Sequence, residues 1–231
     1  MITQLLRMSG TTSDVERFPE HIRDILSLVS PDGATVRFSS GGEYGVHATP
    51  AAGGAPEVWL LGSSDYSAQL AASLGLPYVF ANHFSGEGLE RALDLYRGGY
   101  RPSEAHPEPR TFLTINAVAA PTAEEADARA LPQLRMMARL RTGKQLTALE
   151  TVEQAREALA VEADPQDESI MAAGRRRWLV GTGPDVRAQV AEFAERYAVD
   201  EVMISPVAGA FEGEPMDVSL ARTQTLELLA A

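Results

Sequence analysis

The chain has 231 residues, a length that suits one large domain or two small ones. Its 20 basic and 32 acidic residues give a net charge of −12, which argues against nucleic acid and anionic membranes as partners. Cysteine is absent, which excludes disulfides and thiolate metal sites, and no apolar run approaches the roughly 20 residues of a membrane span. We therefore expect a cytoplasmic protein.

The first part of the chain predicts one helix and a long connection. Apolar residues recur at helical spacing over residues 15–29, and the proline and glycine of residues 30–33 end the pattern. Residues 34–56 are rich in glycine, serine, alanine and proline. We interpret them as a connection with one short strand around residues 35–38.

From residue 57 onward, short apolar runs alternate with helical patterns. The predicted strands cover residues 57–61, 76–81, 110–119, 177–181 and 201–205. The predicted helical segments cover residues 65–74, 85–98, 122–175, 184–198 and 220–230. This alternation predicts right-handed parallel crossovers and an α/β fold. The almost wholly apolar run at 57–61 predicts a strand buried on both faces.

A cluster of small polar residues follows the strand at 57–61. Gly62, Ser63 and Ser64 come directly after it, and Ser67 lies in the first turn of the next helix. Free N–H groups and the helix dipole at such a position suit a phosphate, serine hydroxyls add donors, and a glycine lets the backbone approach closely. The alternative is that Ser64 is an ordinary helix N-cap and Ser63 a turn residue.

His83 ends the next predicted strand, within the sequence Asn82–His83–Phe84. At the carboxyl end of a barrel strand a histidine can donate a hydrogen bond or shuttle a proton. The alternative is a structural histidine bonded to a neighbouring carbonyl group, and the residues leave both open. The remaining histidines are scattered without acidic residues at ligand spacing, so we predict no metal site.

The stretch from Glu57 to Phe84, EVWLLGSSDYSAQLAASLGLPYVFANHF, resembles luciferase-like flavin-dependent monooxygenases of bacteria. The resemblance extends over residues 14–205 and includes the segments 92–96, 115–120 and 200–204. It implies a (β/α)8, TIM-barrel-like fold. Such a barrel takes about 250 residues, and only 56 residues precede Glu57, so the resemblance implies an incomplete barrel without roughly its first four strands.

Within one luciferase-like domain over residues 1–231, we expect four segments. They are a helix and connection (1–56), core βα units (57–120), a helical insertion (121–176) and the last βα units (177–231). The resemblance implies that Gly62, Ser63, Ser64 and Ser67 bind the FMN phosphate and that His83 lies in the pocket near flavin or substrate.

The resemblance implies an oxidoreductase that uses reduced FMN and molecular oxygen to oxygenate a small organic substrate. A deazaflavin (F420) is an alternative cofactor. The alternative function is a truncated, non-catalytic relative that binds flavin or serves as a partner subunit. Because an incomplete barrel exposes two strand edges and an apolar inner face, we also expect a homodimer or another partner that covers them.

Overall fold

The computed structural model describes residues 17–47, 49, 50, 54, 56–84, 86–199, 201–215 and 217–231. The chain divides into two compact units, residues 1–59 and 60–231. Val15 and Ser85, where two helices were predicted to begin, lie outside the described residues. None of the helices formed by the described residues has the length and apolar character needed to cross a bilayer.

The first unit contains one helix and a β-hairpin: α2 (Phe18–Val29), β1 (Ala34–Arg37) and β2 (Glu43–Val46). The strands pair antiparallel, and Gly41, at a φ of 86°, lies in the loop between them, as only glycine readily does. The sequence predicted β1 but not β2. Glu43–Val46 lies in a glycine-rich stretch and is stabilised chiefly by its pairing with β1.

The second unit is built on five parallel strands, which confirms the predicted α/β fold. The strands are β3 (Leu60–Gly62), β4 (Tyr78–Phe80), β5 (Thr111–Ala120), β6 (Leu179–Thr182) and β7 (Val202–Pro206). β3 pairs with β4, and β4 pairs with the start of β5. The middle of β5 pairs with β7, and its end pairs with β6. In the described residues the strands form an open sheet and do not close into a barrel.

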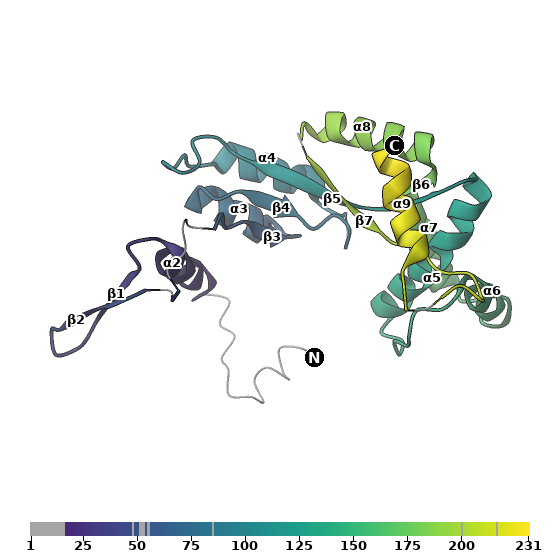
Figure 1. The fold of residues 1–231 in the computed structure, drawn as a ribbon, viewed down its shortest axis with the longest axis horizontal. Coiled ribbons are helices and arrows are strands. Elements are labelled where there is room, and N and C mark those ends of the chain that lie inside the picture. Colours follow the sequence, from purple (N-terminus) through teal and green to yellow (C-terminus); the bar gives the residue numbers. More distant parts are fainter. Residues whose placement is uncertain are drawn as a thin grey trace. The chain divides into compact units, whose positions relative to one another are not determined.

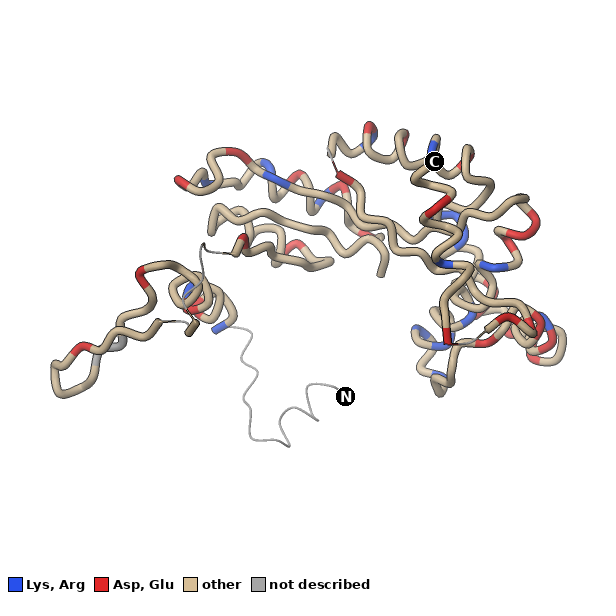
Figure 2. The backbone as a smooth tube through the Cα atoms, in the orientation of Figure 1, with Lys and Arg blue, Asp and Glu red and all other residues tan. Residues whose placement is uncertain are grey.

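Seven helices accompany these strands in the described residues. They are α3 (Asp65–Leu74), α4 (Leu89–Gly99), α5 (Ala123–Thr142), α6 (Val152–Val161), α7 (Pro165–Arg177), α8 (Gly183–Tyr197) and α9 (Leu220–Ala230). Figure 1 shows β5 as the long strand that runs from the region of α3 and α4 toward α5 to α7. Acidic and basic residues are interspersed along the helices (Figure 2).

The two faces of β5 have different cover because successive side chains of a strand point to opposite faces. Ile115, Ala117 and Ala119 pack with residues of α8 and α9. On the other face, Val118 and Ala120 pack with α5 and with β6. The sheet core is therefore thickest around the second half of β5.

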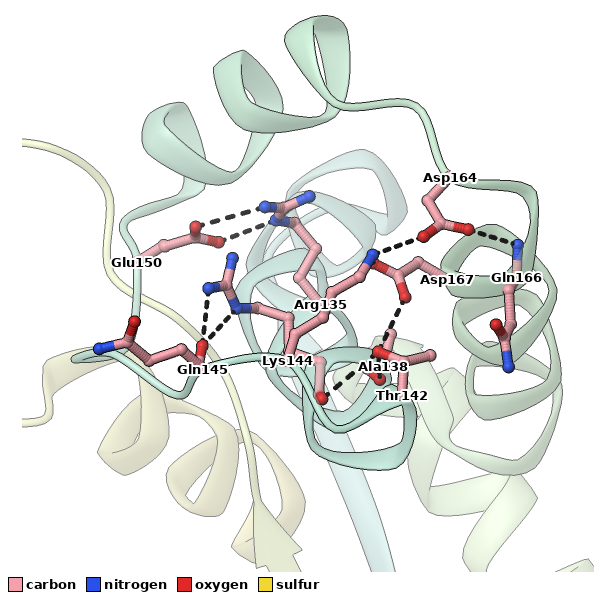
Figure 3. A network of polar contacts seen from close by, with 10 residues as sticks. Arg135, Ala138, Thr142, Lys144, Gln145, Glu150, Asp164, Gln166 and Asp167 are labelled. Carbon is pink, nitrogen blue, oxygen red and sulfur yellow. Dashed lines mark hydrogen bonds and ion pairs between the residues drawn. The ribbon is translucent and has the colours of Figure 1, made fainter.

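The helical segment α5 to α7 is joined by ion pairs (Figure 3). Arg135, whose side chain is 5% exposed, donates to both carboxylate oxygens of Glu150 at 2.8 and 3.4 Å. Lys144 contacts Asp164 at 2.5 Å and Asp167 at 2.8 Å. Arg135 is buried, so loss of its carboxylate partner would be costly, whereas the more exposed Lys144 links the loop after α5 to the start of α7.

Candidate functional site

The serine turn lies at the carboxyl end of β3, where α3 begins. Ser64 has extended backbone angles and is the N-cap of α3. Its Oγ accepts a hydrogen bond from the Ser67 N–H at 3.3 Å, and the Ser64 N–H donates to the Ser67 Oγ at 3.3 Å. This reciprocal capping box satisfies two of the backbone N–H groups at the helix start. The ordinary N-cap role of Ser64, weighed as an alternative, is therefore present.

Capping leaves part of the helix start available to a ligand. The N–H groups of Asp65 and Tyr66, in the first turn, have no acceptor four residues earlier within the helix. Ser63 and Ser64 are both exposed. The carboxylate of Asp65 would oppose an anion, but Arg91 lies 2.8 Å from it and offsets its charge. The turn thus offers hydroxyl and N–H donors at the positive end of the helix dipole.

The Ser67 side chain points into the chain, and its position requires a glycine at residue 62. Its Oγ donates to the Ser64 carbonyl oxygen at 2.8 Å and lies 3.3 Å from the Tyr78 hydroxyl, which itself donates to the Gly62 carbonyl oxygen at 3.2 Å. A Cβ on Gly62 would lie 2.4 Å from the Ser67 Oγ. Gly62 is therefore needed for the close approach of Ser67. Burial raises the pKa of Tyr78, so this hydroxyl keeps its proton.

His83 lies in the turn after β4 and folds onto β5. Its Nδ1 is 2.7 Å from the Thr114 Oγ1, and its backbone N–H donates to the same oxygen at 3.2 Å. The Asn116 side-chain amide donates to the His83 carbonyl oxygen at 2.8 Å. Thr114 is fully buried and Asn116 is 6% exposed. Partial burial lowers the pKa of His83 below its usual 6.5, which favours the neutral imidazole at neutral pH.

The two turns lie at one edge of the sheet. β3 and β4 are parallel neighbours with Gly62 opposite Phe80, and the Ala81 N–H donates to the Gly62 carbonyl oxygen at 2.9 Å. Carboxyl ends of parallel strands meet at the same edge, where ligands of α/β proteins bind. The sequence-predicted residues thus come from two consecutive turns of this edge.

Thr114 and Asn116 were not among the predicted site residues. They alternate along β5, so they share a face of the sheet, and they are the two buried polar side chains of an otherwise largely apolar strand. That alternation of polar residues within an apolar run was the available indication. Both side chains form hydrogen bonds with His83, and the sequence alone does not show that these residues are in contact.

A separate cleft of about 340 Å³ is lined by Asn82, Ile115 and α8, with Arg176, Arg177 and Arg196 among its residues. Ile115 lies on the face of β5 opposite Thr114. The cleft therefore reaches the face of β5 opposite Thr114, and Arg177 lines both this cleft and the hollow that contains His83. Among the described residues, no group of three histidine, aspartate or glutamate side chains is arranged to hold a metal ion.

Comparison with known proteins assigns the chain to a family. The family model described as luciferase-like monooxygenase matches residues 10–200, most of the chain. The chain belongs to the luciferase-like monooxygenase family. The uncharacterized protein YceB of Bacillus subtilis is 33% identical over 230 residues, which cover 98% of this chain and 65% of YceB. A luciferase-like monooxygenase of Escherichia coli is 39% identical over 137 residues, 59% of this chain and 38% of that protein.

Several solved structures share the fold. Apo-MsnO8 gives a TM-score of 0.72 at 23% identity, covering 95% of this chain and 60% of that one. The oxygenating constituent of 3,6-diketocamphane monooxygenase from Pseudomonas putida, in complex with FMN, gives 0.59 at 17% identity, covering 98% and 66%. An F420-dependent secondary alcohol dehydrogenase gives 0.52 at 12% identity, covering 97% and 66%.

These comparisons confirm the predicted family and the TIM-barrel-like α/β fold. This luciferase-like chain spans 65% or less of the length of the curated relatives named above. One prediction for β3 was wrong. The strand at residues 57–61 was expected to be buried on both faces, but Leu61 is 57% exposed, because in the described residues no layer covers that face of β3.

Proposed function

We propose that this luciferase-like chain is a flavin-dependent monooxygenase that uses reduced FMN and molecular oxygen on a small organic substrate. The observation that carries the proposal is the edge formed by the serine turn and the His83 turn at the carboxyl ends of β3 and β4. The family membership and the FMN complex of a structural neighbour support the same cofactor class.

The residues of the serine turn fit a phosphate. We propose that the hydroxyls of Ser63 and Ser64 and the N–H groups of Asp65 and Tyr66 hold the FMN phosphate. The Ser64 hydroxyl would exchange its long 3.4 Å contact with the Ser67 Oγ for the phosphate. Ser67 and Gly62 contribute by shaping the turn, because the Ser67 hydroxyl is already bonded within the chain. The bound flavin would supply the oxygen chemistry, and the protein would orient it and exclude water.

His83 is proposed as the residue that faces flavin or substrate. Its lowered pKa favours a neutral imidazole, Thr114 contacts the ring at Nδ1, and Asn116 anchors the His83 backbone carbonyl. A neutral histidine can accept a proton or a hydrogen bond from a reacting group. We propose that the His83 imidazole accepts a proton from the reacting group.

The test is a titration of the purified chain with FMN, followed by flavin fluorescence. Ser64→Ala removes one donor to a charged group, worth about 1.5–3 kcal/mol, so we expect the Kd to rise about tenfold or more. The matched control is Thr122→Ala, because the Thr122 side chain also caps a helix, accepting from the Glu125 N–H at 3.1 Å. It should leave the Kd unchanged.

The outcomes separate the candidate functions. FMN binding weakened in Ser64→Ala alone, together with oxygen uptake on reduced FMN, would support the monooxygenase. Binding without oxygen uptake under any substrate tested would support the non-catalytic relative. Equal affinity in the wild type and both variants would refute the phosphate site. Competition by F420 at lower concentration than FMN would assign the deazaflavin instead.

We also propose that a second copy of the chain covers the inner face of the sheet. This face, which lies opposite Ile115, carries Leu61, Val79, Phe112 and Met203 by strand register. Leu61 and Met203 are 57% and 45% exposed, whereas Val79 is buried. Exposed apolar side chains along an open sheet favour association. We expect sedimentation of a dimer at micromolar concentration, a monomer for Leu61→Glu, and an unchanged dimer for Tyr66→Glu on exposed α3. A monodisperse wild-type monomer would contradict this.

A further inference from the structure

The Thr114 hydroxyl is the centre of a three-way contact beneath His83. Thr114 is fully buried, so water cannot replace a missing partner. Its Oγ1 accepts from the His83 backbone N–H at 3.2 Å, donates to the Phe80 carbonyl oxygen at 3.2 Å, and lies 2.7 Å from the His83 Nδ1. The last contact is the shortest, and its direction depends on which ring nitrogen carries the proton.

A threonine hydroxyl has one hydrogen to donate and two lone pairs to accept with. If the hydroxyl donates to Nδ1, its bond to the Phe80 carbonyl oxygen is lost and one lone pair stays unused. If the His83 Nδ1–H donates instead, Oγ1 accepts from both His83 N–H groups and keeps its own donation to Phe80. Only the second arrangement uses every hydrogen-bonding position of this buried hydroxyl, and aligned bonds of this kind strengthen one another.

We infer that Thr114 is a positioning residue that holds neutral His83 as the Nδ1–H tautomer, which leaves Nε2 as a hydrogen-bond and proton acceptor. The Asn116 amide supports this geometry by its 2.8 Å bond to the His83 carbonyl oxygen. The charged side chains that line the same small hollow as His83 are Arg141 of α5 and Arg177 of α7. Both are cationic, so neither offers a competing acceptor for the imidazole N–H.

The tautomer determines which ligand groups His83 can meet. A lone pair on Nε2 pairs with a hydroxyl or an N–H group and gives no hydrogen bond to a carbonyl or ether oxygen. Where the proposed monooxygenase function holds, the group that approaches His83 is therefore a donor on flavin or substrate. The tautomer itself does not depend on that function, because it follows from contacts within the chain.

Nitrogen-15 spectroscopy of the histidine-labelled chain without flavin tests the inference directly. Long-range proton–nitrogen spectra at neutral pH distinguish protonated from unprotonated ring nitrogens, and His83→Gln assigns the resonances. We expect a protonated Nδ1 and an unprotonated Nε2 for His83. A protonated Nε2 with an unprotonated Nδ1 would overturn the inference. Because flavin is absent, a failure here is separate from a failure of FMN binding.

Two substitutions test the role of Thr114. Thr114→Ser keeps the hydroxyl and should keep the Nδ1–H form, whereas Thr114→Val removes the acceptor and should shift His83 toward the Nε2–H form. A purely structural role would give the same tautomer in all three proteins, and that result would refute positioning by Thr114. If the valine variant does not fold, a loss of the Nδ1–H form in Thr114→Ser would still contradict the inference, and its retention would support it.

Discussion

Thr225 of α9 takes the place of a neighbouring strand beside β5. Its hydroxyl accepts from the Ala119 N–H at 3.2 Å and lies 3.2 and 3.0 Å from the carbonyl oxygens of Ala119 and Ala221. Thr225 and Ala119 are both 0% exposed. The pairing of β7 with β5 ends at Ala117, so the hydroxyl continues the bonding of β5 where that strand stops. Thr225 therefore fixes α9 to the central strand.

The substitution Thr225→Val removes the hydroxyl and nearly preserves the shape of the side chain. It leaves the buried Ala119 N–H without an acceptor, which costs about 1–3 kcal/mol. We therefore expect the free energy of unfolding to fall by about 2 kcal/mol. In a chain of this size that loss lowers the Tm by about 4–8 °C. Thermal and urea unfolding followed by far-UV circular dichroism measure both quantities.

The control for this prediction is Thr225→Ser. Serine keeps the hydroxyl and loses one methyl group, a cost of about 1 kcal/mol from lost apolar burial. We expect the order of stability to be wild type, serine variant, valine variant. A valine variant as stable as the wild type, or more stable than the serine variant, would show that packing and not the hydrogen bonds holds α9 on the sheet.

Three further predictions concern the site edge and its neighbours. Gly62→Ala, whose Cβ would lie 2.4 Å from the Ser67 Oγ, should destabilise the chain by about 1–3 kcal/mol in urea unfolding. Burial raises the pKa of Tyr96 from 10.0 to about 12, so stability should fall as the pH rises from 10 to 12, and Tyr96→Phe should flatten that fall. His83 has a lowered pKa, so its contribution is complete above pH 6.5 and declines as the pH falls below that value. In His83→Gln, stability measured from neutral to acidic pH should decline less.

Elements with local stop and start residues were predictable from the sequence. The predicted helix at residues 65–74 matches α3 because Ser64 caps its start and Gly75, at a φ of 63°, ends it. The predicted helix at residues 184–198 likewise corresponds to α8, whose N-cap Thr182 forms a capping box with Asp185. These boundaries are encoded by neighbouring residues, so no distant contact is needed to find them.

Strand boundaries depended on partners that the sequence does not show. The run at residues 57–61 was expected to be the strand, but β3 is Leu60–Gly62, because only these residues pair with β4. The exposure of Leu61 has the same origin, since burial of a strand face requires another layer. The contact of His83 with Thr114 joins residues 31 positions apart, and local patterns carry no information about it.

The Gly62 carbonyl oxygen links the two turns of the proposed site. It accepts from the Ala81 N–H at 2.9 Å and from the Tyr78 hydroxyl at 3.2 Å, so one peptide group joins the end of β3 to the end of β4. The serine turn begins at the residue that follows, and His83 lies two residues after Ala81. A shift of β3 relative to β4 would therefore move the proposed phosphate donors relative to the imidazole. Because both turns are anchored to the same paired strands, the spacing between the serine turn and the imidazole is set by the sheet and not by the flexibility of the loops.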